Sequence, residues 1–233
     1  MRESFERIED GNSIKIEVEP NAYAYSNRYS WLFSVFIKQS VFDDIEFMEL
    51  RESLIIALEH DEKAKYVGMR FVDGWIELYF YASTSKELDK VTSKILSSSA
   101  YIFESNVVKD SKWDFYKYNL YPTELELCHM ESKKIIAMLE EEGDSLSIPR
   151  IVEHYISFET PTQKDRFIKN MNLEGFNFKD ELSSDEFENG VALECEHAVS
   201  ESEVNKVVET LFTEVKKENG FYEGWSTTLI SKI

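Results

Sequence analysis

The sequence predicts an α+β protein in which the element order β-α-β-β-α-β occurs twice along the chain. Stretches of period-two hydrophobicity, typical of half-buried strands, alternate with helical stripes. Hairpin and helix-start signals separate them, and the same order appears on both sides of residues 121–123. This order is that of the ferredoxin-like sandwich, a sheet covered on one face by two helices. We therefore expect two ferredoxin-like domains in tandem, residues 1–122 and 123–233.

The elements of the first half follow from local patterns. Alternating hydrophobicity predicts strands at residues 31–37, 67–71, 76–80 and 101–108. Helical stripes predict helices at residues 43–60 and 84–95. Asp73-Gly74 predicts a hairpin turn between the middle strands, because glycine tolerates the positive φ that such turns require. Thr84 and Glu87 predict a capping box at the start of the second helix.

The second half begins with a helix that stops at Gly143. Alternation then predicts strands at residues 152–158, 176–182, 191–195 and 224–230. The start of a helix is predicted by Thr160, Pro161 and Gln163, a hydroxyl cap followed by proline at the first helical position and glutamine at the third. The last helix, with a long apolar stripe, begins at a second predicted capping box, Ser200 with Glu203, and ends at Gly220.

The charge of the chain excludes several classes of partner. Lys and Arg total 26 against 45 Asp and Glu, so the net charge is −19 and the pI is near 4.7. Up to Pro122 there are 15 basic and 21 acidic residues, and beyond it 11 and 24, so the second half is the stronger anion. Such a surface repels phosphate backbones and anionic lipids, and we expect no direct binding to nucleic acid or membrane. Basic protein surfaces and metal cations remain as partners.

Two further features indicate a cytoplasmic protein. The chain contains no apolar run near the roughly 20 residues that a membrane span needs, and its first residues lack the apolar core of a signal peptide. Cys128 and Cys195 lie far apart in the sequence, which does not favour a disulfide framework and fits a reducing compartment.

Two histidines and a cysteine are candidates for a metal site. His154, Cys195 and His197 fall in the apolar phase of two strands that would be neighbours in the predicted sheet, so they are able to converge on Zn²⁺. A small apolar cysteine and hydrogen-bonded core histidines explain the same pattern. We favour this second interpretation and expect no metal site and no cofactor.

Paired carboxylates are frequent but do not predict catalysis. They occur at Asp43-Asp44, Glu140-Glu141-Glu142, Glu194 with Glu196, and Asp185-Glu186 with Glu188. Acid–base catalysis needs one carboxyl group in an apolar pocket, and no pair is framed by apolar residues at suitable spacing. The sequence also contains no Gly-rich phosphate loop, Gly-x-Ser-x-Gly, His-Glu-x-x-His or Cys-x-x-Cys. We expect no catalytic residues.

Aromatic residues gather at two places. One group precedes the boundary between the halves, at Trp113, Phe115, Tyr116, Tyr118 and Tyr121, and the other lies near the last strand, at Phe221, Tyr222 and Trp225. Tyr and Trp are enriched at interfaces because they bury a large area and keep a polar group. The same rings can instead close the domain junction or the end of the core. We favour this second interpretation, and the sequence does not decide between the two.

The second half resembles a known family, regulator of ribonuclease activity B, over residues 131–230. The resembling stretches are Glu131-Ser132-Lys133-Lys134-Ile135-Ile136, Leu139-Glu140-Glu141-Glu142-Gly143-Asp144, Ile151-Val152-Glu153-His154-Tyr155-Ile156 and Tyr222-Glu223-Gly224-Trp225. The resemblance implies a ferredoxin-like domain that binds a ribonuclease and damps its cleavage without catalysis. Relatives carry a long acidic C-terminal tail, whereas this sequence ends at Ile233, so a contact made by that tail is not carried over.

The first half resembles the family catalogued as domain of unknown function 695. The resembling stretches are Tyr66-Val67-Gly68, Gly74-Trp75-Ile76-Glu77-Leu78-Tyr79-Phe80-Tyr81, Trp113-Asp114-Phe115-Tyr116 and Leu120-Tyr121-Pro122. This resemblance implies no activity, so the role of the first half stays open.

The leading hypothesis is a cytoplasmic regulatory protein that binds another protein, a ribonuclease being the candidate, through its acidic second half. The candidate contact residues are Glu140, Glu141, Glu142, Asp144, Tyr222 and Trp225. One alternative is a small-molecule sensor with its ligand between the two domains, since domain interfaces favour ligand sites. A second alternative is a metal-dependent hydrolase that uses His154, His197 and carboxylates scattered along the sequence.

Overall fold

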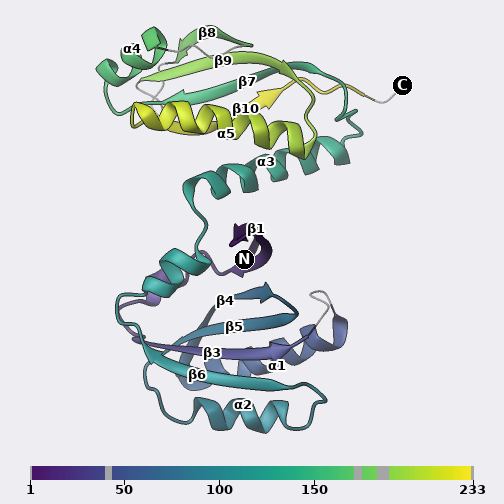
Figure 1. The fold of residues 1–233 in the computed structure, drawn as a ribbon, viewed down its shortest axis with the longest axis vertical. Coiled ribbons are helices and arrows are strands. Elements are labelled where there is room, and N and C mark those ends of the chain that lie inside the picture. The colour runs from purple at the N-terminus through teal and green to yellow at the C-terminus, as the bar shows by residue number, and fades with distance from the viewer. Residues whose placement is uncertain (1, 40–43, 171–174, 183–188, 232–233) are drawn as a thin grey trace. The chain divides into compact units, whose positions relative to one another are not determined.

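The computed structural model describes residues 2–39, 44–170, 175–182 and 189–231. They form two compact units, Met1–Pro122 and Thr123–Ile233 (Figure 1). Each unit combines helices with a sheet whose neighbouring strands are antiparallel. The predicted mixed α+β class is therefore confirmed. Among the described residues, none of the helices has both the length and the apolar character that crossing a membrane requires.

The first unit contains a six-stranded sheet in the order β1-β2-β4-β5-β3-β6. Its strands are β1 Glu3–Glu9, β2 Asn12–Val18, β3 Trp31–Lys38, β4 Ala64–Val72, β5 Trp75–Ala82 and β6 Phe103–Lys109. Its helices are α1 Ile45–Glu59 and α2 Leu88–Leu96, with the short helical turns η1 Ala22–Tyr25, η2 His60–Glu62 and η3 Tyr116–Leu120. The predicted Asp73-Gly74 turn joins β4 to β5, with φ of 49° and 77°.

Sequence patterns missed the hairpin of β1 and β2. Its turn is Asp10-Gly11, a pair that itself signals a hairpin, and both residues have positive φ. β1 lies at the edge of the sheet and none of its residues is fully buried, so it lacks the apolar alternation that marks a strand.

The sheet of the first unit is covered on both faces, which corrects the expectation of a single covered face. Alternate residues of a strand point to opposite faces. Leu78 and Phe80 of β5 pack with α1 and α2, whereas Tyr79 and Tyr81 pack in a second core with residues 113–120. The second face is closed because this segment places large aromatic rings on it.

The capping box predicted at Thr84 and Glu87 is wrong. α2 begins only at Leu88, and Glu87 takes the N-cap position with a left-handed φ of 68° and no capping hydrogen bond from its side chain. The Thr84 hydroxyl instead accepts a hydrogen bond of 3.3 Å from the backbone N–H of Lys86. The hydroxyl is therefore used in the loop and not at the helix start.

The second unit contains a four-stranded sheet in the order β10-β7-β9-β8. Its elements are α3 Glu124–Glu141, β7 Arg150–Ser157, α4 Pro161–Asn170, β8 Phe176–Leu182, β9 Gly190–His197, α5 Glu201–Lys217 and β10 Phe221–Thr227. The box predicted at Thr160 and Gln163 is confirmed by reciprocal hydrogen bonds of 3.3 and 3.0 Å. Ser200 is the N-cap of α5, as predicted, but its side chain makes no capping hydrogen bond.

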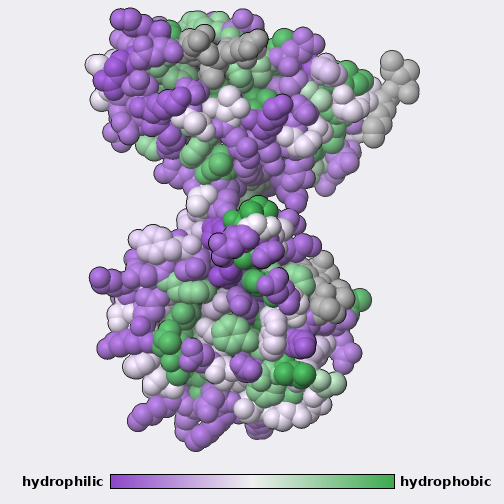
Figure 2. Space-filling model, in the orientation of Figure 1, coloured by the Kyte–Doolittle hydropathy of each residue, from purple (hydrophilic) through white to green (hydrophobic). Residues whose placement is uncertain are grey.

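The core of the second unit lies between the sheet and the helices. The apolar stripe of α5 supplies Val204, Val208, Leu211 and Val215, and α3 adds Ile136. On the side drawn in Figure 2, hydrophilic residues cover most of this unit.

Candidate functional site

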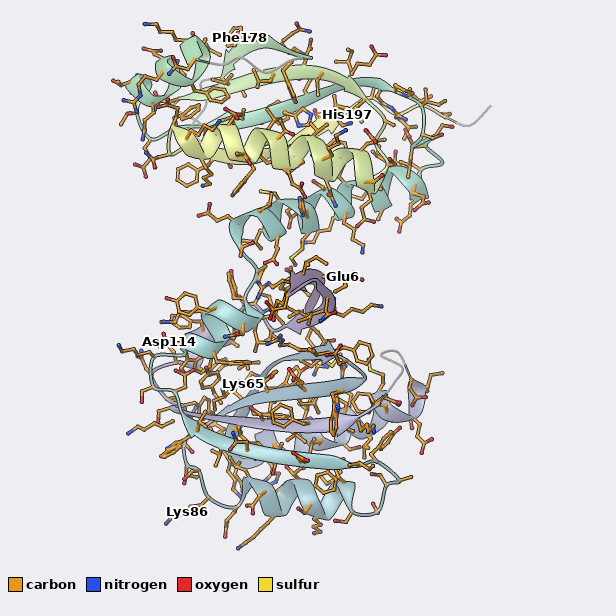
Figure 3. All side chains as sticks on the ribbon, in the orientation of Figure 1. Glu6, Lys65, Lys86, Asp114, Phe178 and His197 are labelled. Carbon is orange, nitrogen blue, oxygen red and sulfur yellow. The ribbon has the colours of Figure 1, made fainter. Side chains whose placement is uncertain are left out.

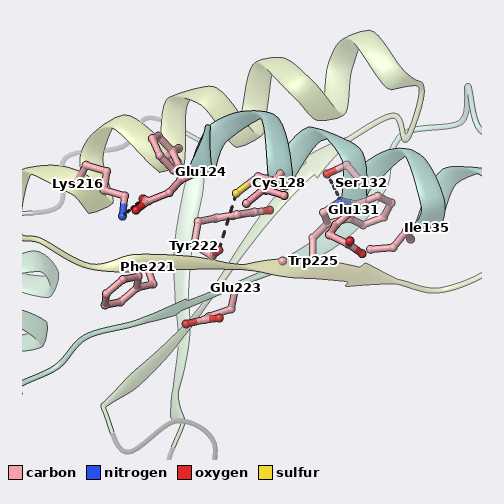
Figure 4. Close-up of a pocket in the computed structure, with 13 residues that line it drawn as sticks. Glu124, Cys128, Glu131, Ser132, Ile135, Lys216, Phe221, Tyr222, Glu223 and Trp225 are labelled. Atoms are coloured by element: carbon pink, nitrogen blue, oxygen red, sulfur yellow. Dashed lines mark hydrogen bonds and ion pairs between the residues drawn. The ribbon is translucent and has the colours of Figure 1, made fainter. Parts of the chain in front are cut away.

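An apolar groove of about 340 Å³ lies in the second unit beside β10 (Figure 4). Three elements line it. α3 contributes Glu124, Leu127, Cys128, Glu131, Ser132 and Ile135, α5 contributes Phe212 and Lys216, and β10 contributes residues 221–225. The size is that of a small ligand pocket, or of a pocket for one or two side chains of a protein partner.

The wall formed by α3 follows from helical spacing. The lining residues of α3 recur every three or four positions and so share one face of the helix. Thr123 is the N-cap of this helix. Its hydroxyl accepts the Glu126 N–H at 3.3 Å, and the Glu126 carboxylate accepts the Thr123 N–H at 2.7 Å. This capping box fixes the first turn of the wall.

A bulge in β10 places both aromatic residues on the groove floor. Tyr222 and Trp225 are three positions apart, a spacing that puts side chains on opposite faces of a regular strand. The pairing of β10 with β7 shifts between Tyr222 and Gly224, and Gly224 has φ of 135°, which favours glycine. The extra residue, Glu223, brings Tyr222 and Trp225 to the same face.

The polar atoms of the floor have partners and carry no charge. The Tyr222 hydroxyl lies 2.8 Å from Nδ1 of His154, and Nε1–H of Trp225 donates to Oγ of Ser132 at 3.0 Å. Burial raises the pKa of the Cys128 thiol to about 11. Burial also raises the pKa of Tyr222. The floor therefore presents neutral, mainly apolar surface.

The rim of the groove is acidic. Its charged side chains are the carboxylates of Glu124 and Glu131 and one ammonium group, Lys216. The Glu223 carboxylate lies on the other side of β10, where it accepts a hydrogen bond from the Ser157 hydroxyl (Figure 4). Lys216 lies 2.5 Å from Glu124, and its Nζ is 4.8 Å from the centroid of the exposed Phe221 ring. At this end the groove thus already holds a lysine between a carboxylate and an aromatic ring, an arrangement that stabilises a cation.

The contact residues expected from the sequence do not all meet. Tyr222 and Trp225 come together in the groove. Glu140, Glu141 and Glu142 are exposed at the C-terminal end of α3 and do not line it.

Asp144 is 1% exposed and forms a bidentate ion pair with Arg150, at 2.6 and 2.8 Å. Its carboxylate also accepts the Ile230 N–H at 2.7 Å. These contacts make Asp144 a structural residue of the interior and not an accessible anion.

His154, Cys195 and His197 come together in the core of the same unit. His154 Nε2 lies 3.3 Å from His197 Nε2 and 3.5 Å from Cys195 Sγ. Burial, with His197 nearby, lowers the pKa of His154 to about 3, and burial raises that of Cys195 to about 12. In the absence of a metal ion, both side chains are therefore neutral at physiological pH.

The paired carboxylates of the sequence are dispersed. Glu194 lies 2.9 Å from Lys179, and Glu196 is exposed on β9. Asp44 is the N-cap of α1, where its side chain accepts the Phe47 N–H at 2.8 Å. The remaining candidates, Asp43, Asp185, Glu186 and Glu188, lie outside the described residues.

Sequence reasoning missed the α3 and α5 walls of the groove. The available signal was the spacing of Glu124, Cys128, Glu131 and Ile135, which lie on one helical face. The contribution of Lys216 depends on how α5 packs against α3, which no local pattern gives.

Part of each half matches a known family model. No curated protein and no solved structure matches the chain. Residues 43–121 match the Family of unknown function (DUF695). Residues 129–227 match the family described as Regulator of ribonuclease activity B. The two family models therefore match the chain in this order, as the sequence resemblance indicated.

Proposed function

We propose that this chain is a non-catalytic regulatory protein whose second unit binds a ribonuclease and changes its activity. The observation that carries the proposal is the acidic-rimmed apolar groove. All of its lining residues except Glu124, Leu127 and Cys128 fall within the segment that matches Regulator of ribonuclease activity B. The family description supplies the class of partner, and the groove supplies a place where a partner binds.

The proposed occupant is a basic polypeptide segment with an apolar anchor side chain. The uncharged floor of Tyr222 and Trp225 fits an apolar anchor, since buried anchors in pockets carry most interface energy. The carboxylate of Glu131, which lies 2.7 Å from Lys134 Nζ in the free chain, fits a flanking Lys or Arg side chain of the partner. The excess of 24 acidic over 11 basic residues beyond Pro122 attracts such a segment from a distance.

The fold that we propose for each unit is the ferredoxin-like sandwich, with a domain boundary between Pro122 and Thr123. The support is the strand order. Across the sheet of the second unit, the neighbouring strands are the fourth, first, third and second strands of that unit in chain order. β3, β4, β5 and β6 of the first unit have the same arrangement, and β1 and β2 extend that sheet beyond β4.

The proposal is tested by charge reversal around the groove. The chain is first used to capture its partner. That partner must be identified as a ribonuclease, and its cleavage rate must change when the purified chain is added. We expect Glu131→Lys to weaken this complex about tenfold, which corresponds to about 1.4 kcal/mol. The association rate of the unmodified chain should also fall steeply with salt, since ions screen such attraction beyond about 8 Å.

The matched controls are two reversals with the same change in net charge. Glu196→Lys alters an exposed carboxylate of β9 away from the groove, and Glu140→Lys alters the acidic end of α3. Both should keep at least half of the affinity. If Glu140→Lys weakens binding more than Glu131→Lys, the acidic helix end and not the groove is the docking site. Failure to change any ribonuclease's cleavage contradicts the regulatory role itself.

A further inference from the structure

The trio His154, Cys195 and His197 lies on one face of two adjacent strands. In the pairing of β7 with β9, Val152 is opposite Cys195 and Arg150 is opposite His197. Side chains two positions apart on a strand share a face, so His154 joins the two β9 residues on the buried side. Their exposures are 0%, 6% and 8%, and Figure 3 labels His197 within this unit.

Two of the three distances between the donor atoms are those of a tetrahedral metal site. Typical bond lengths to Zn²⁺ place two histidine nitrogens about 3.4 Å apart, and a nitrogen and a thiolate sulfur about 3.6 Å apart. The corresponding distances here are 3.3 Å between the two Nε2 atoms and 3.5 Å between His154 Nε2 and Cys195 Sγ. All three donor atoms lie within 4.8 Å of one another.

The outer nitrogens of both histidines have partners that suit metal ligation. His197 Nδ1 lies 2.7 Å from the carbonyl oxygen of Ala198, which only accepts, so Nδ1 carries the proton and the lone pair of Nε2 faces His154. His154 Nδ1 lies 2.8 Å from the Tyr222 hydroxyl, which is able to accept its proton in the same way. Metal-binding histidines commonly donate their second N–H to such a partner.

We propose that His154 Nε2, Cys195 Sγ and His197 Nε2 form a binding site for one Zn²⁺ ion. Imidazole nitrogen and thiolate sulfur favour this borderline-soft cation over Mg²⁺ or Ca²⁺, which prefer oxygen ligands. Two Nε2–metal bonds and one Sγ–metal bond form, and Cys195 releases its thiol proton to solvent as the third bond forms. This inference departs from the sequence expectation of core residues without metal, and it stands independently of the proposed partner.

An arrangement of hydrogen bonds without a metal explains the same distances, so an experiment must distinguish the two. If Tyr222 donates to His154 Nδ1, then His154 Nε2–H donates to His197 Nε2, and the same distances are satisfied by hydrogen bonds alone. The full chain is unfolded with a chelator and refolded with and without one equivalent of ZnCl₂. We expect about one zinc per chain after gel filtration, by elemental analysis, and a higher melting temperature of the zinc-loaded sample.

Variants identify the ligands. Cys195→Ser is nearly isosteric and should weaken zinc binding at least a hundredfold, whereas Cys128→Ser, at the other free cysteine, should leave it unchanged. Tyr222→Phe removes no ligand but removes the partner of His154, and should weaken binding about tenfold to a hundredfold. Co²⁺ refolded into the unmodified chain should give thiolate-to-cobalt charge-transfer absorption.

The proposal is overturned if the refolded chain retains less than a tenth of an equivalent of zinc and melts at the same temperature with and without it. It is equally overturned if Cys195→Ser binds zinc as tightly as the unmodified chain. The first test uses only the unmodified chain. The proposal can therefore be overturned even if a variant fails to fold.

Discussion

The two aromatic groups of the chain have similar composition but different surroundings. In the first unit, the Trp113 ring stacks on Tyr81 with centroids 3.8 Å apart and meets the edge of Tyr116 at 5.6 Å. Nε1–H of Trp113 donates to the Tyr29 carbonyl at 2.6 Å, and the Tyr116 hydroxyl donates to the Glu19 carbonyl at 2.9 Å. Trp113 and Tyr116 are 0% and 1% exposed, so their rings close a core.

In the second unit, Tyr222 and Trp225 are nearly as buried, at 8% and 4%, yet they form the floor of an open groove. Their polar atoms also have partners, His154 and Ser132. The difference lies in what stands over the rings: aromatic neighbours in the first unit, and a helix face separated by a groove in the second. Low exposure of a ring therefore does not distinguish a core residue from the floor of a binding site.

The largest expected effect comes from removing the centre of the first group. Trp113→Ala should lower the free energy of unfolding by about 4 kcal/mol, because it leaves a cavity in a packed core. Trp113 also has a left-handed φ of 57°, a conformation that a bulky residue keeps only when packing enforces it. Urea unfolding followed by near-ultraviolet circular dichroism measures the change.

The matched control is Tyr118→Ala in the same segment. Tyr118 is 74% exposed, and its truncation should change stability by less than about 0.5 kcal/mol. Equal losses for Trp113→Ala and Tyr118→Ala would contradict a core built on Trp113.

The next effect separates the two kinds of carboxylate at the end of α3. Asp144→Asn keeps the size of the side chain but leaves Arg150 buried without an opposite charge, and should destabilise the second unit by about 3 kcal/mol. Glu142→Gln, two residues earlier and exposed, should change stability by less than about 0.5 kcal/mol. Thermal unfolding compares the two variants. An Asp144→Asn variant as stable as the unmodified chain would contradict the structural role of the ion pair between Asp144 and Arg150.

Local patterns predicted the elements whose signals are local. The capping box at Thr160 was predicted because its cap residues are close together in the sequence. Strands β3, β5 and β7 were predicted because their apolar alternation is continuous. β1 was missed because an edge strand buries little and because its two apolar residues, Phe5 and Ile8, are three positions apart and give no period-two pattern in the sequence. The Thr84 box was misassigned because the loop, and not the helix, uses that hydroxyl.

The groove depends on features that sequence periodicity does not contain. The spacing of Tyr222 and Trp225 predicts opposite faces, and only the bulge at residues 222–224 brings them together. Likewise, the sequence placed His154 on the apolar side of its strand. The distance of His154 from Cys195 and His197, however, depends on the register between β7 and β9. Pairing across strands therefore decides both sites of the second unit.

The smallest effect tests whether the groove floor is held by its polar contact. Trp225→Phe keeps most of the ring but removes the Nε1–H that donates to Ser132, and should lower stability by about 1 kcal/mol. Ser132→Ala removes the acceptor and should have a similar effect. Because both changes remove the same hydrogen bond, the double variant should lose no more than about 1 kcal/mol instead of the sum. Strictly additive losses in a double-mutant cycle would mean that packing alone positions Trp225.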